Sequence, residues 1–206
     1  MSLPAPGRIA VLVSGRGSNL LALHEAIGRG ELPAEIVLVL ANDPAAPALA
    51  RARELGLPTV AVPGRGEPSR EAHEAKVMAA LDEAGAGWIC LAGYMRLLSP
   101  YFLRRYPRRV VNIHPSLLPA FPGLDAQRQA LEHGVKITGC TVHLADEGLD
   151  SGPIVAQRAV AVADDDDRDR LAARILEQEH RLYPEALCRL LVERWEVRGR
   201  RLVFFT

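Results

Sequence analysis

Residues 110–115 read Val-Val-Asn-Ile-His-Pro and join the end of an apolar run to two polar side chains and a proline. The proline disfavours helical geometry at His114 and favours an extended backbone. Because alternate side chains of an extended chain point the same way, Asn112 and His114 share one face. A carboxamide beside an imidazole can polarise a carbonyl group and move a proton. The alternative interpretation is a strand end with one polar cap and one hydrogen-bonded histidine.

The composition of the chain narrows the classes of protein to which it can belong. Its 206 residues suffice for one α/β domain, and 25 basic residues balance 25 acidic ones. A zero net charge argues against nonspecific nucleic-acid binding but leaves small anionic substrates open. No apolar run reaches the roughly 18–20 residues of a membrane span. Cys90, Cys140 and Cys188 are far apart in apolar surroundings, which is typical of buried thiols in a cytoplasmic protein.

Short apolar segments alternate with amphipathic ones through the first half of the chain. Uniformly apolar strands between helices indicate a parallel sheet covered on both faces. The predicted strands are residues 8–13, 35–40, 59–62, 88–92 and 110–113. We expect helices capped by Ser18 or Asn19 and by Ser69, and others beginning near Ala48 and Ser99. The helix after Ser69 carries Ala72, Lys76, Val77, Ala80 and Leu81 along one side.

The pattern changes in the second half of the chain. Residues 136–146 and 153–162 are extended segments whose connection is too short for a crossover helix, which predicts an antiparallel pair. A helix follows over about residues 168–194, and residues 202–205 form an edge strand. The predicted fold is a single-domain α/β, Rossmann-like open sheet, mostly parallel with a C-terminal antiparallel portion and helices on both faces. Residues 1–7 are a flexible lead, not a signal peptide, and residues 8–206 form the domain.

Polar segments follow four of the predicted strands, at residues 15–19, 42–43, 93–96 and 112–115. Ligands of open α/β sheets bind beyond the carboxyl ends of the strands. We therefore expect these segments to gather at one edge of the sheet. This expectation favours an active-site role for Asn112 and His114 over the alternative of a strand end with one polar cap and one hydrogen-bonded histidine.

The segment Gly15-Arg16-Gly17-Ser18-Asn19 opens a helix and can cradle a phosphate, because a helix start offers unpaired N–H groups to an anion. The alternative is a tight turn with a helix cap. A dinucleotide fingerprint needs a third glycine where Leu20 stands, although Asp43 after the second strand could serve as the ribose acid. No Gly-Lys-Ser/Thr sequence occurs, which excludes a P-loop.

Asp150 lies in the short link between the two extended segments. A carboxylate near His114 would raise the imidazole pKa and hold its tautomer, although an aspartate in a turn often bonds its own backbone. His143 on the preceding strand is more typical of a packed, hydrogen-bonded histidine. A metal site of His114, His143 and Asp150 has suitable residue types but lacks a His-x-x-x-His or His-Glu-x-x-His anchor.

Glu179 falls on the apolar stripe of the late helix, with Leu171, Ile175 and Leu182 at helical spacing. A carboxylate on a buried stripe needs hydrogen-bond partners, which sugar hydroxyls could supply. Otherwise the stripe ends there and Glu179 reaches solvent.

Five motifs occur in an order that resembles a known family. They are residues 14–20 (SGRGSNL), 91–100 (LAGYMRLLSP), 112–119 (NIHPSLLP), 141–153 and 178–184 (QEHRLYP). Together they resemble phosphoribosylglycinamide formyltransferase, the folate-dependent enzyme of purine synthesis, over about residues 9–191. The serine at position 151 departs from the glycine of many relatives, and the family varies at the position of Arg16.

The resemblance implies a role for each matching residue. Gly17, Ser18 and Asn19 would bind the phosphate of phosphoribosylglycinamide, and Glu179 its ribose. The formyl donor, 10-formyltetrahydrofolate, would be held by Arg70, Met95, Arg96, Leu97, Leu98, Asn112, Asp146, Glu147, Gly148, Leu149 and Asp150. Asn112, His114 and Asp150 would be catalytic, with no metal. The family also often has a cis peptide before the second proline of NIHPSLLP, which we expect at Leu118-Pro119.

Formyl transfer in purine (IMP) synthesis is therefore the expected activity, with small-molecule substrates, no nucleic acid, no membrane, and a monomer or weak homodimer. A hydrolase releasing formate from the same folate would carry an extra N-terminal regulatory domain, and a transfer-RNA formyltransferase an extra C-terminal one. A nucleotide-binding module using Gly15, Gly17 and Asp43 is the alternative from another class. It leaves Asn112, His114 and Asp150 without a role.

Overall fold

The structure is a computed structural model that describes residues 6–205. These residues group into two compact units, which divide between Val111 and Asn112. Residues 1–5 of the predicted N-terminal lead lie outside the described residues, and Gly7 already belongs to the first strand. None of the helices within residues 6–205 is both long enough and apolar enough to cross a membrane.

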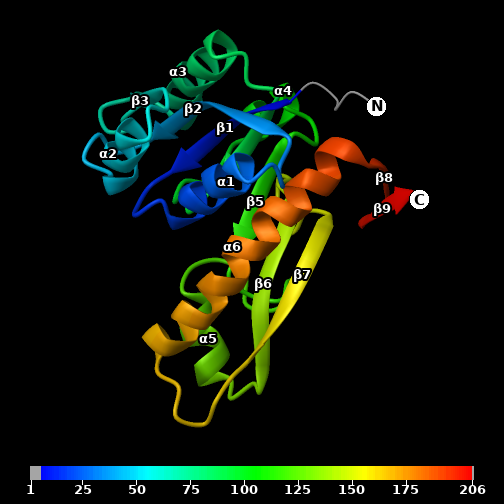
Figure 1. Cartoon of the computed structure of the whole chain (residues 1–206). Coiled ribbons are helices and arrows are strands. Elements are labelled where there is room, and N and C mark those ends of the chain that lie inside the picture. The colour runs from blue at the N-terminus through cyan, green and yellow to red at the C-terminus, as the bar shows by residue number, and fades with distance from the viewer. Residues whose placement is uncertain (1–5, 206) are drawn as a thin grey trace. The chain divides into compact units, whose positions relative to one another are not determined.

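The first unit alternates strands and helices, as the sequence predicts. Its elements are β1 (Gly7–Val13), α1 (Ser18–Gly28), β2 (Ala34–Ala41), α2 (Pro47–Glu54), β3 (Thr59–Ala61), α3 (Arg70–Glu83), β4 (Trp88–Leu91) and α4 (Pro100–Arg105). The strands lie in the order β3-β2-β1-β4, and each pair is parallel (Figure 1). Residues 9–13 of the central strand β1 are fully buried, because both of its neighbours and the covering helices exclude water.

The helix starts of this unit are only partly as predicted. Ser69 and Ser99 cap α3 and α4, each accepting a hydrogen bond from the backbone three residues on. The prediction that Ser18 or Asn19 caps α1 is wrong, because Gly17 occupies the cap with φ of 76° and no side chain caps the helix. Glycine adopts this left-handed conformation without the steric cost that a β-carbon imposes.

The buried face of α3 also differs from the prediction. It consists of His73, Glu74, Val77, Met78 and Leu81, so Lys76 is exposed. This face includes two polar side chains, His73 and Glu74, whose burial cannot be predicted from the spacing of apolar residues. Each is hydrogen-bonded, His73 to the carbonyl of Val62 and Glu74 to Ser99.

The second unit contains the predicted antiparallel pair. Its elements are β5 (Val110–His114, which crosses the division), α5 (Ala126–Glu132), β6 (Ile137–Leu144), β7 (Ile154–Ala161), α6 (Arg168–Val192), β8 (Arg194–Arg198) and β9 (Arg201–Phe205). The strand order is β5-β6-β7-β9-β8, with β6–β7 and β8–β9 antiparallel and β7–β9 parallel. Helix α5 and strand β8 are not predicted from the sequence, and the predicted edge strand, β9, is not at the edge because β8 pairs with its outer side. The α/β class with a mostly parallel sheet and antiparallel C-terminal strands is confirmed.

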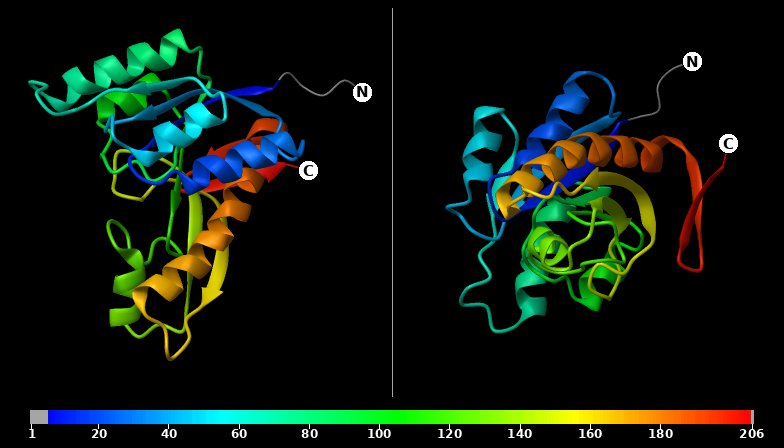
Figure 2. Two further views of the ribbon diagram at one scale, coloured as in Figure 1. Left: turned by 60° about the vertical axis from the view of Figure 1, so that its left-hand side comes forward. Right: turned by 90° about the horizontal axis from the view of Figure 1, so that it is seen from below.

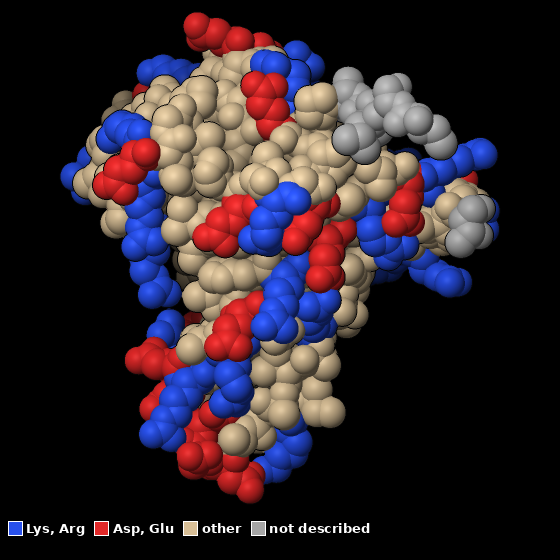
Figure 3. All heavy atoms as spheres, viewed as in Figure 1, with Lys and Arg blue, Asp and Glu red and all other residues tan. Residues whose placement is uncertain are grey.

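The long helix α6 packs along β6 and β7 (Figures 1 and 2). Its buried stripe contains Leu171, Ile175, Glu179 and Leu182, as predicted, and Pro184 lies inside the helix. Acidic and basic side chains are interspersed over its outer side (Figure 3). Ion pairs there, such as Arg189–Glu193, are exposed, so they contribute little to stability.

One further prediction is confirmed, and a second, that all three cysteines are buried, is confirmed for two of them. The Leu118-Pro119 peptide bond is cis. Cys90 and Cys140 are free and buried, whereas Cys188 is free and half-buried.

Candidate active site

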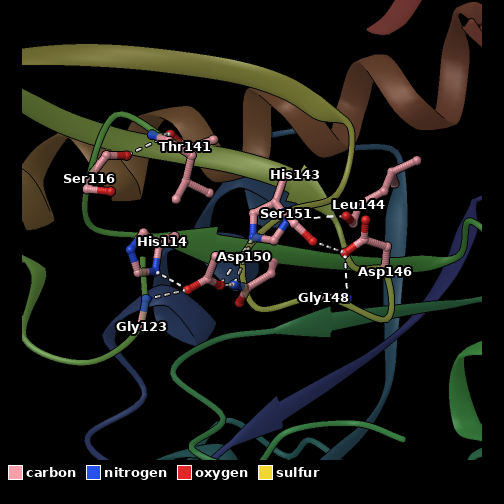
Figure 4. Close-up of polar contacts among 12 residues, drawn as sticks. His114, Ser116, Gly123, Thr141, His143, Leu144, Asp146, Gly148, Asp150 and Ser151 are labelled. Carbon is pink, nitrogen blue, oxygen red and sulfur yellow. Dashed lines mark hydrogen bonds and ion pairs between the residues drawn. The ribbon is translucent and has the colours of Figure 1, made fainter. Parts of the chain in front are cut away.

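Asn112, His114 and Asp150 come together in the second unit (Figure 4). The first two lie on β5, and Asp150 is in the loop between β6 and β7. The Nδ1 atom of His114 lies 3.4 Å from Oδ2 of Asp150, and the Asn112 amide donates to Oδ1 of Asp150 at 3.4 Å. The three residues predicted to be catalytic thus form one cluster.

His143 is a fourth member of this cluster, on the other side of the Asp150 carboxylate from His114 (Figure 4). Its Nδ1 lies 3.1 Å from the carbonyl of Leu144, and a carbonyl only accepts, so Nδ1 carries the hydrogen. Its Nε2 then accepts from the Asn112 amide at 3.1 Å. His143 is buried and hydrogen-bonded, as the sequence suggested, but it also contacts two residues predicted to be catalytic.

Both amide hydrogens of Asn112 are therefore engaged, one by His143 and one by Asp150. The contact with Asp150 is the longer of the two and lies beyond the usual range for N–H···O bonds. A substrate oxygen can replace it while the bond to His143 keeps the carboxamide in place. This arrangement suits Asn112 to hydrogen-bond donation toward a developing oxyanion.

Residues 115–123, which we term the proline loop, contribute two backbone groups to the cluster. The carbonyl of Phe121 accepts a hydrogen bond from Nε2 of His114 at 2.9 Å. The amide of Gly123 donates to Oδ2 of Asp150 at 2.8 Å. Phe121 has φ of 54°, a conformation that costs about 1–3 kcal/mol for a residue with a bulky side chain. Because Nε2 keeps its hydrogen on this carbonyl, Nδ1 is the nitrogen of His114 that gains or loses a proton.

The loop that carries Asp150 is held by its own side chains. The Asp146 carboxylate accepts from the Gly148 amide at 3.1 Å and from the Ser151 hydroxyl at 2.7 Å (Figure 4). Asp150 itself has φ of 48°. Arg200, in the turn between β8 and β9, donates to the carbonyl of Ser151 at 3.0 Å. The serine that departs from the family pattern therefore fits this loop and adds a hydrogen bond to it.

Burial is the largest influence on the His114 imidazole, and it lowers the pKa of that group. The Phe121 carbonyl and the Asp150 carboxylate raise this pKa, but the net shift is downward. The predicted effect of Asp150, which is to raise the His114 pKa, is confirmed, although burial outweighs it. Burial also raises the pKa of Asp150, but His143 in its protonated form, the Gly123 amide and His114 outweigh it and lower that pKa.

The geometry of His114, His143 and Asp150 bears on the alternative that they bind a metal ion. His114, His143 and Asp150 do lie side by side, yet one nitrogen of each imidazole faces a backbone carbonyl. Within residues 6–205, no group of three or more His, Cys, Asp and Glu side chains is arranged to hold a metal ion. The cluster is built from hydrogen bonds instead.

In the first unit, Ser14 joins the loops that follow three strands. Its amide donates to the Gly93 carbonyl at 3.2 Å, its hydroxyl donates to Asn42 at 2.5 Å, and the Met95 amide donates to its hydroxyl at 2.8 Å. The predicted gathering of these loops is confirmed within this unit. Asp43, considered above as a ribose acid, instead accepts from the Ala45 amide in its own turn.

The residues predicted to bind phosphate lie at the start of α1. Gly17 caps the helix, Ser18 is its first residue and Asn19 is buried. A β-carbon at Gly17 would lie 2.6 Å from that of Ala48, so glycine lets this loop approach α2 closely. Gly15 and Arg16 are exposed.

Gly17→Ala is expected to destabilise the protein by about 1–3 kcal/mol, through overpacking against Ala48 and the left-handed φ. Urea denaturation of the variant measures this loss. Gly15→Ala is the matched control, because a β-carbon there meets nothing within 4 Å. Equal denaturation midpoints for the two variants would contradict the prediction.

The predicted folate residues include exposed apolar side chains. Met95 and Leu97 in the first unit are 66% and 60% exposed, and Leu149 in the second unit is 54% exposed. Arg96 lies against Gly64, and Arg70 is exposed at the first residue of α3. Large apolar side chains that are exposed two residues apart, as Met95 and Leu97 are, are typical of ligand-binding or interaction surfaces.

The contact that supports residues 95–98 is not predicted from the sequence. Ser99, directly after Leu98, donates its amide to the buried carboxylate of Glu74 at 2.7 Å, and its hydroxyl donates to the same carboxylate. These charge-assisted bonds attach the end of the segment to α3.

A family of proteins described as formyl transferase matches residues 7–187. The chain belongs to this formyl transferase family. The match covers every residue that the sequence analysis placed in the site. It ends inside α6, so the hairpin of β8 and β9 lies beyond it.

Several proteins similar to this formyl transferase are named for the formylation of phosphoribosylglycinamide or for purine synthesis. Phosphoribosylglycinamide formyltransferase of Escherichia coli (strain K12) is 40% identical over 93% of this chain and 88% of that protein. The crystal structure of glycinamide ribonucleotide transformylase 1 from Symbiobacterium toebii has a TM-score of 0.96 and 45% identity, over 99% of this chain and 96% of that one. The trifunctional purine biosynthetic protein adenosine-3 of Drosophila melanogaster is 47% identical over 89% of this chain. The chain spans only 14% of that longer protein.

Glu179 lies on the buried stripe of α6 in this formyl transferase and is 7% exposed. Burial raises the pKa of the Cys140 thiol to about 12, and the negative charge of Glu179 adds to this effect. The carboxylate is therefore close to β6, inside the second unit. The predicted position of Glu179 on the buried stripe is confirmed, and the alternative, in which it reaches solvent, is wrong.

Proposed function

We propose that the chain transfers the formyl group of 10-formyltetrahydrofolate to the amine of 5'-phosphoribosylglycinamide in de novo purine (IMP) synthesis. The observation that carries this proposal is the cluster of Asn112, His114 and Asp150, in a chain of the formyl transferase family. The relatives named for this reaction align over most of their own length.

The proposed reaction is direct transfer. The amine nitrogen attacks the formyl carbon, and the carbonyl oxygen becomes an oxyanion. Asn112 donates an amide hydrogen to this oxygen. Protonated His114 donates from Nδ1, which is not bonded to the Phe121 carbonyl and whose contact with Asp150, at 3.4 Å, is long enough for the oxyanion to share its hydrogen. The bond from the formyl carbon to folate nitrogen then breaks. That nitrogen takes up a proton as the attacking amine loses one, and Asp150 orders a water that carries the proton.

The binding residues follow from the same proposal. The α1 start with Gly17, Ser18 and Asn19 takes the phosphate, because its N–H groups and dipole favour an anion. Glu179 accepts from the ribose hydroxyls. Arg70, the segment from Met95 to Leu98 and the loop from Asp146 to Asp150 hold the folate, whose flat ring suits exposed apolar side chains.

The folate acts as a co-substrate, and we assign no metal to the reaction. The cytoplasmic location and the monomeric or weakly dimeric state remain predictions from the sequence. So does a single formyltransferase domain over residues 8–206.

The test is to incubate the protein with 10-formyltetrahydrofolate in the presence and absence of phosphoribosylglycinamide while the folate absorption spectrum is followed. A spectral change that requires the ribonucleotide supports formyl transfer. A change without it supports hydrolysis to formate, and the appearance of free formate distinguishes the two products. No change in either mixture would contradict the proposal.

Asp150→Asn is expected to move the pH dependence of kcat/KM. Protonated His114 is a donor in the proposed mechanism, so kcat/KM falls as the pH rises through the His114 pKa. The Asp150 carboxylate raises that pKa, and its removal lowers it, which moves the falling limb to lower pH. Profiles measured between about pH 5 and 9 detect this shift. Asp43→Asn, whose carboxylate bonds its own turn, is the control, and overlapping falling limbs for wild type and Asp150→Asn would contradict the role.

A further inference from the structure

The proline loop determines the surroundings of two residues of the catalytic cluster. His114 bonds the Phe121 carbonyl of this loop, and Asp150 bonds the Gly123 amide. A displacement of the loop would alter both contacts together. What fixes the loop is therefore important for the reaction, even where it is distant from the reacting atoms.

Two side chains on the strand pair β6–β7 hold the beginning of the loop. The Thr141 hydroxyl donates to the Ser116 carbonyl at 2.6 Å and accepts from the Leu118 amide at 3.0 Å. The Gln157 amide donates to the Leu118 carbonyl at 2.8 Å and to the Thr141 hydroxyl at 3.0 Å. Three of these bonds connect Ser116 and Leu118 of the loop to a regular sheet, and the fourth joins the two sheet side chains to each other.

This network uses the full hydrogen-bonding capacity of its donors. A hydroxyl has one hydrogen and two acceptor positions, and all three are filled at Thr141. Both hydrogens of the Gln157 amide are also used. Thr141 and Gln157 lie directly opposite each other in the register of β6 and β7, so the sheet fixes their spacing. Thr141 is fully buried, and the loss of its hydroxyl would leave buried groups unpaired.

We propose that Thr141 and Gln157 are positioning residues of the catalytic cluster, which hold the proline loop so that its carbonyl and amide groups meet His114 and Asp150. They act through the loop and contact neither the imidazole nor the carboxylate in the bonds described. Thr141 is the main support because it is buried. Gln157, an exposed residue of β7, donates the third hydrogen bond of the Thr141 hydroxyl.

Thr141→Val removes the hydroxyl at nearly constant volume and is the principal test. We expect kcat to fall by about 10- to 100-fold, as misplacement of catalytic groups commonly does, with smaller changes in both KM values. The bond to Phe121 raises the His114 pKa and the bond to Gly123 lowers that of Asp150. Weakening the bond to Phe121 lowers the His114 pKa and moves the falling limb of the pH profile to lower pH. Weakening the bond to Gly123 raises the Asp150 pKa and moves the rising limb, which follows the deprotonation of Asp150, to higher pH. The profile should therefore become narrower.

Thr138→Val is the matched control. Thr138 lies on the same strand and is equally buried, and its hydroxyl has no hydrogen-bond partner within the described part of the chain. Its substitution should leave kcat and the pH profile unchanged. Thr141→Ser keeps the hydroxyl and should restore both limbs of the profile. If Thr141→Val matches wild type, or if Thr138→Val narrows the profile equally, the proposal is overturned.

If Thr141→Val does not fold, Gln157→Met is the second test of the positioning role. It should fold, because Gln157 is exposed and its loss leaves no cavity. A narrower profile for this variant supports the proposal, and unchanged limbs overturn it. The kinetic readout rests on the proposed function. Titration of the His114 ring proton by NMR, assigned with His114→Gln, measures the same shift without turnover. A protein that lacks formyl transfer can thus still support or contradict the positioning role.

Discussion

Asn112→Ala is expected to lower kcat for formyl transfer by about 100- to 1000-fold, the usual loss when one oxyanion donor is removed. The loss follows because no other side chain of the cluster can supply the neutral N–H that the Asn112 amide presents beside Asp150. Steady-state kinetics with both substrates near saturation measure it. KM should change far less than kcat, because the interaction forms mainly in the transition state.

Asn112→Asp separates the donor from the volume of the side chain. It keeps the shape of asparagine but only accepts hydrogen bonds when ionised, and it places a second negative charge beside Asp150. We expect it to be as inactive as the alanine variant. Turnover by either variant within about ten-fold of wild type would be incompatible with oxyanion donation by Asn112. Thermal denaturation confirms that each variant is folded.

His114→Ala is expected to produce a loss of similar size in kcat. The imidazole is 5% exposed, hydrogen-bonded to Phe121 and next to Asp150, so alanine removes a donor and leaves a cavity. His114→Gln fills most of that cavity and still donates a hydrogen bond, but it cannot carry a proton at neutral pH. If proton transfer is required, the glutamine variant is also inactive. If only packing is required, it is active.

Added imidazole gives an independent measurement on His114→Ala. Partial recovery of kcat that depends on the concentration of protonated imidazole supports the donor role. His24→Ala, a histidine variant in the first unit, serves as the control and should have wild-type kinetics. A His114→Ala protein with normal turnover would refute the assignment.

The strands and most helices could be predicted because each carries a local signal. Residues 9–13 are apolar without interruption, and Ser69 and Ser99 stand directly before helices. Helix α5 is short and carries no comparable signal. Strand β8 does alternate polar and apolar residues, as strands do, but it has only five residues and directly follows the long helix α6. The buried face of α3 was missed because Glu74 is polar, and its partner Ser99 is distant in sequence.

The clustering of the residues proposed to be catalytic could be predicted because they lie close together in the sequence or in a motif of the family. The supporting groups could not, because they are backbone atoms or depend on the tertiary path of the chain. Nothing in the sequence shows that the carbonyl of Phe121 faces His114, or that Gln157 reaches Leu118. The direction of the His114 pKa shift could not be predicted for the same reason, because it depends on how completely the folded chain buries the ring.

The left-handed backbone of Asp150 limits what a mutational library at this position can sample. Asparagine, aspartate and glycine tolerate φ near 48°, whereas branched and bulky residues must distort the loop. Most codons at position 150 would therefore report on folding of the loop and not on chemistry. A search for altered acyl donors in this scaffold has more freedom at Ala120 of the proline loop, which has no positive φ, because the contacts of this loop to the cluster come from its backbone.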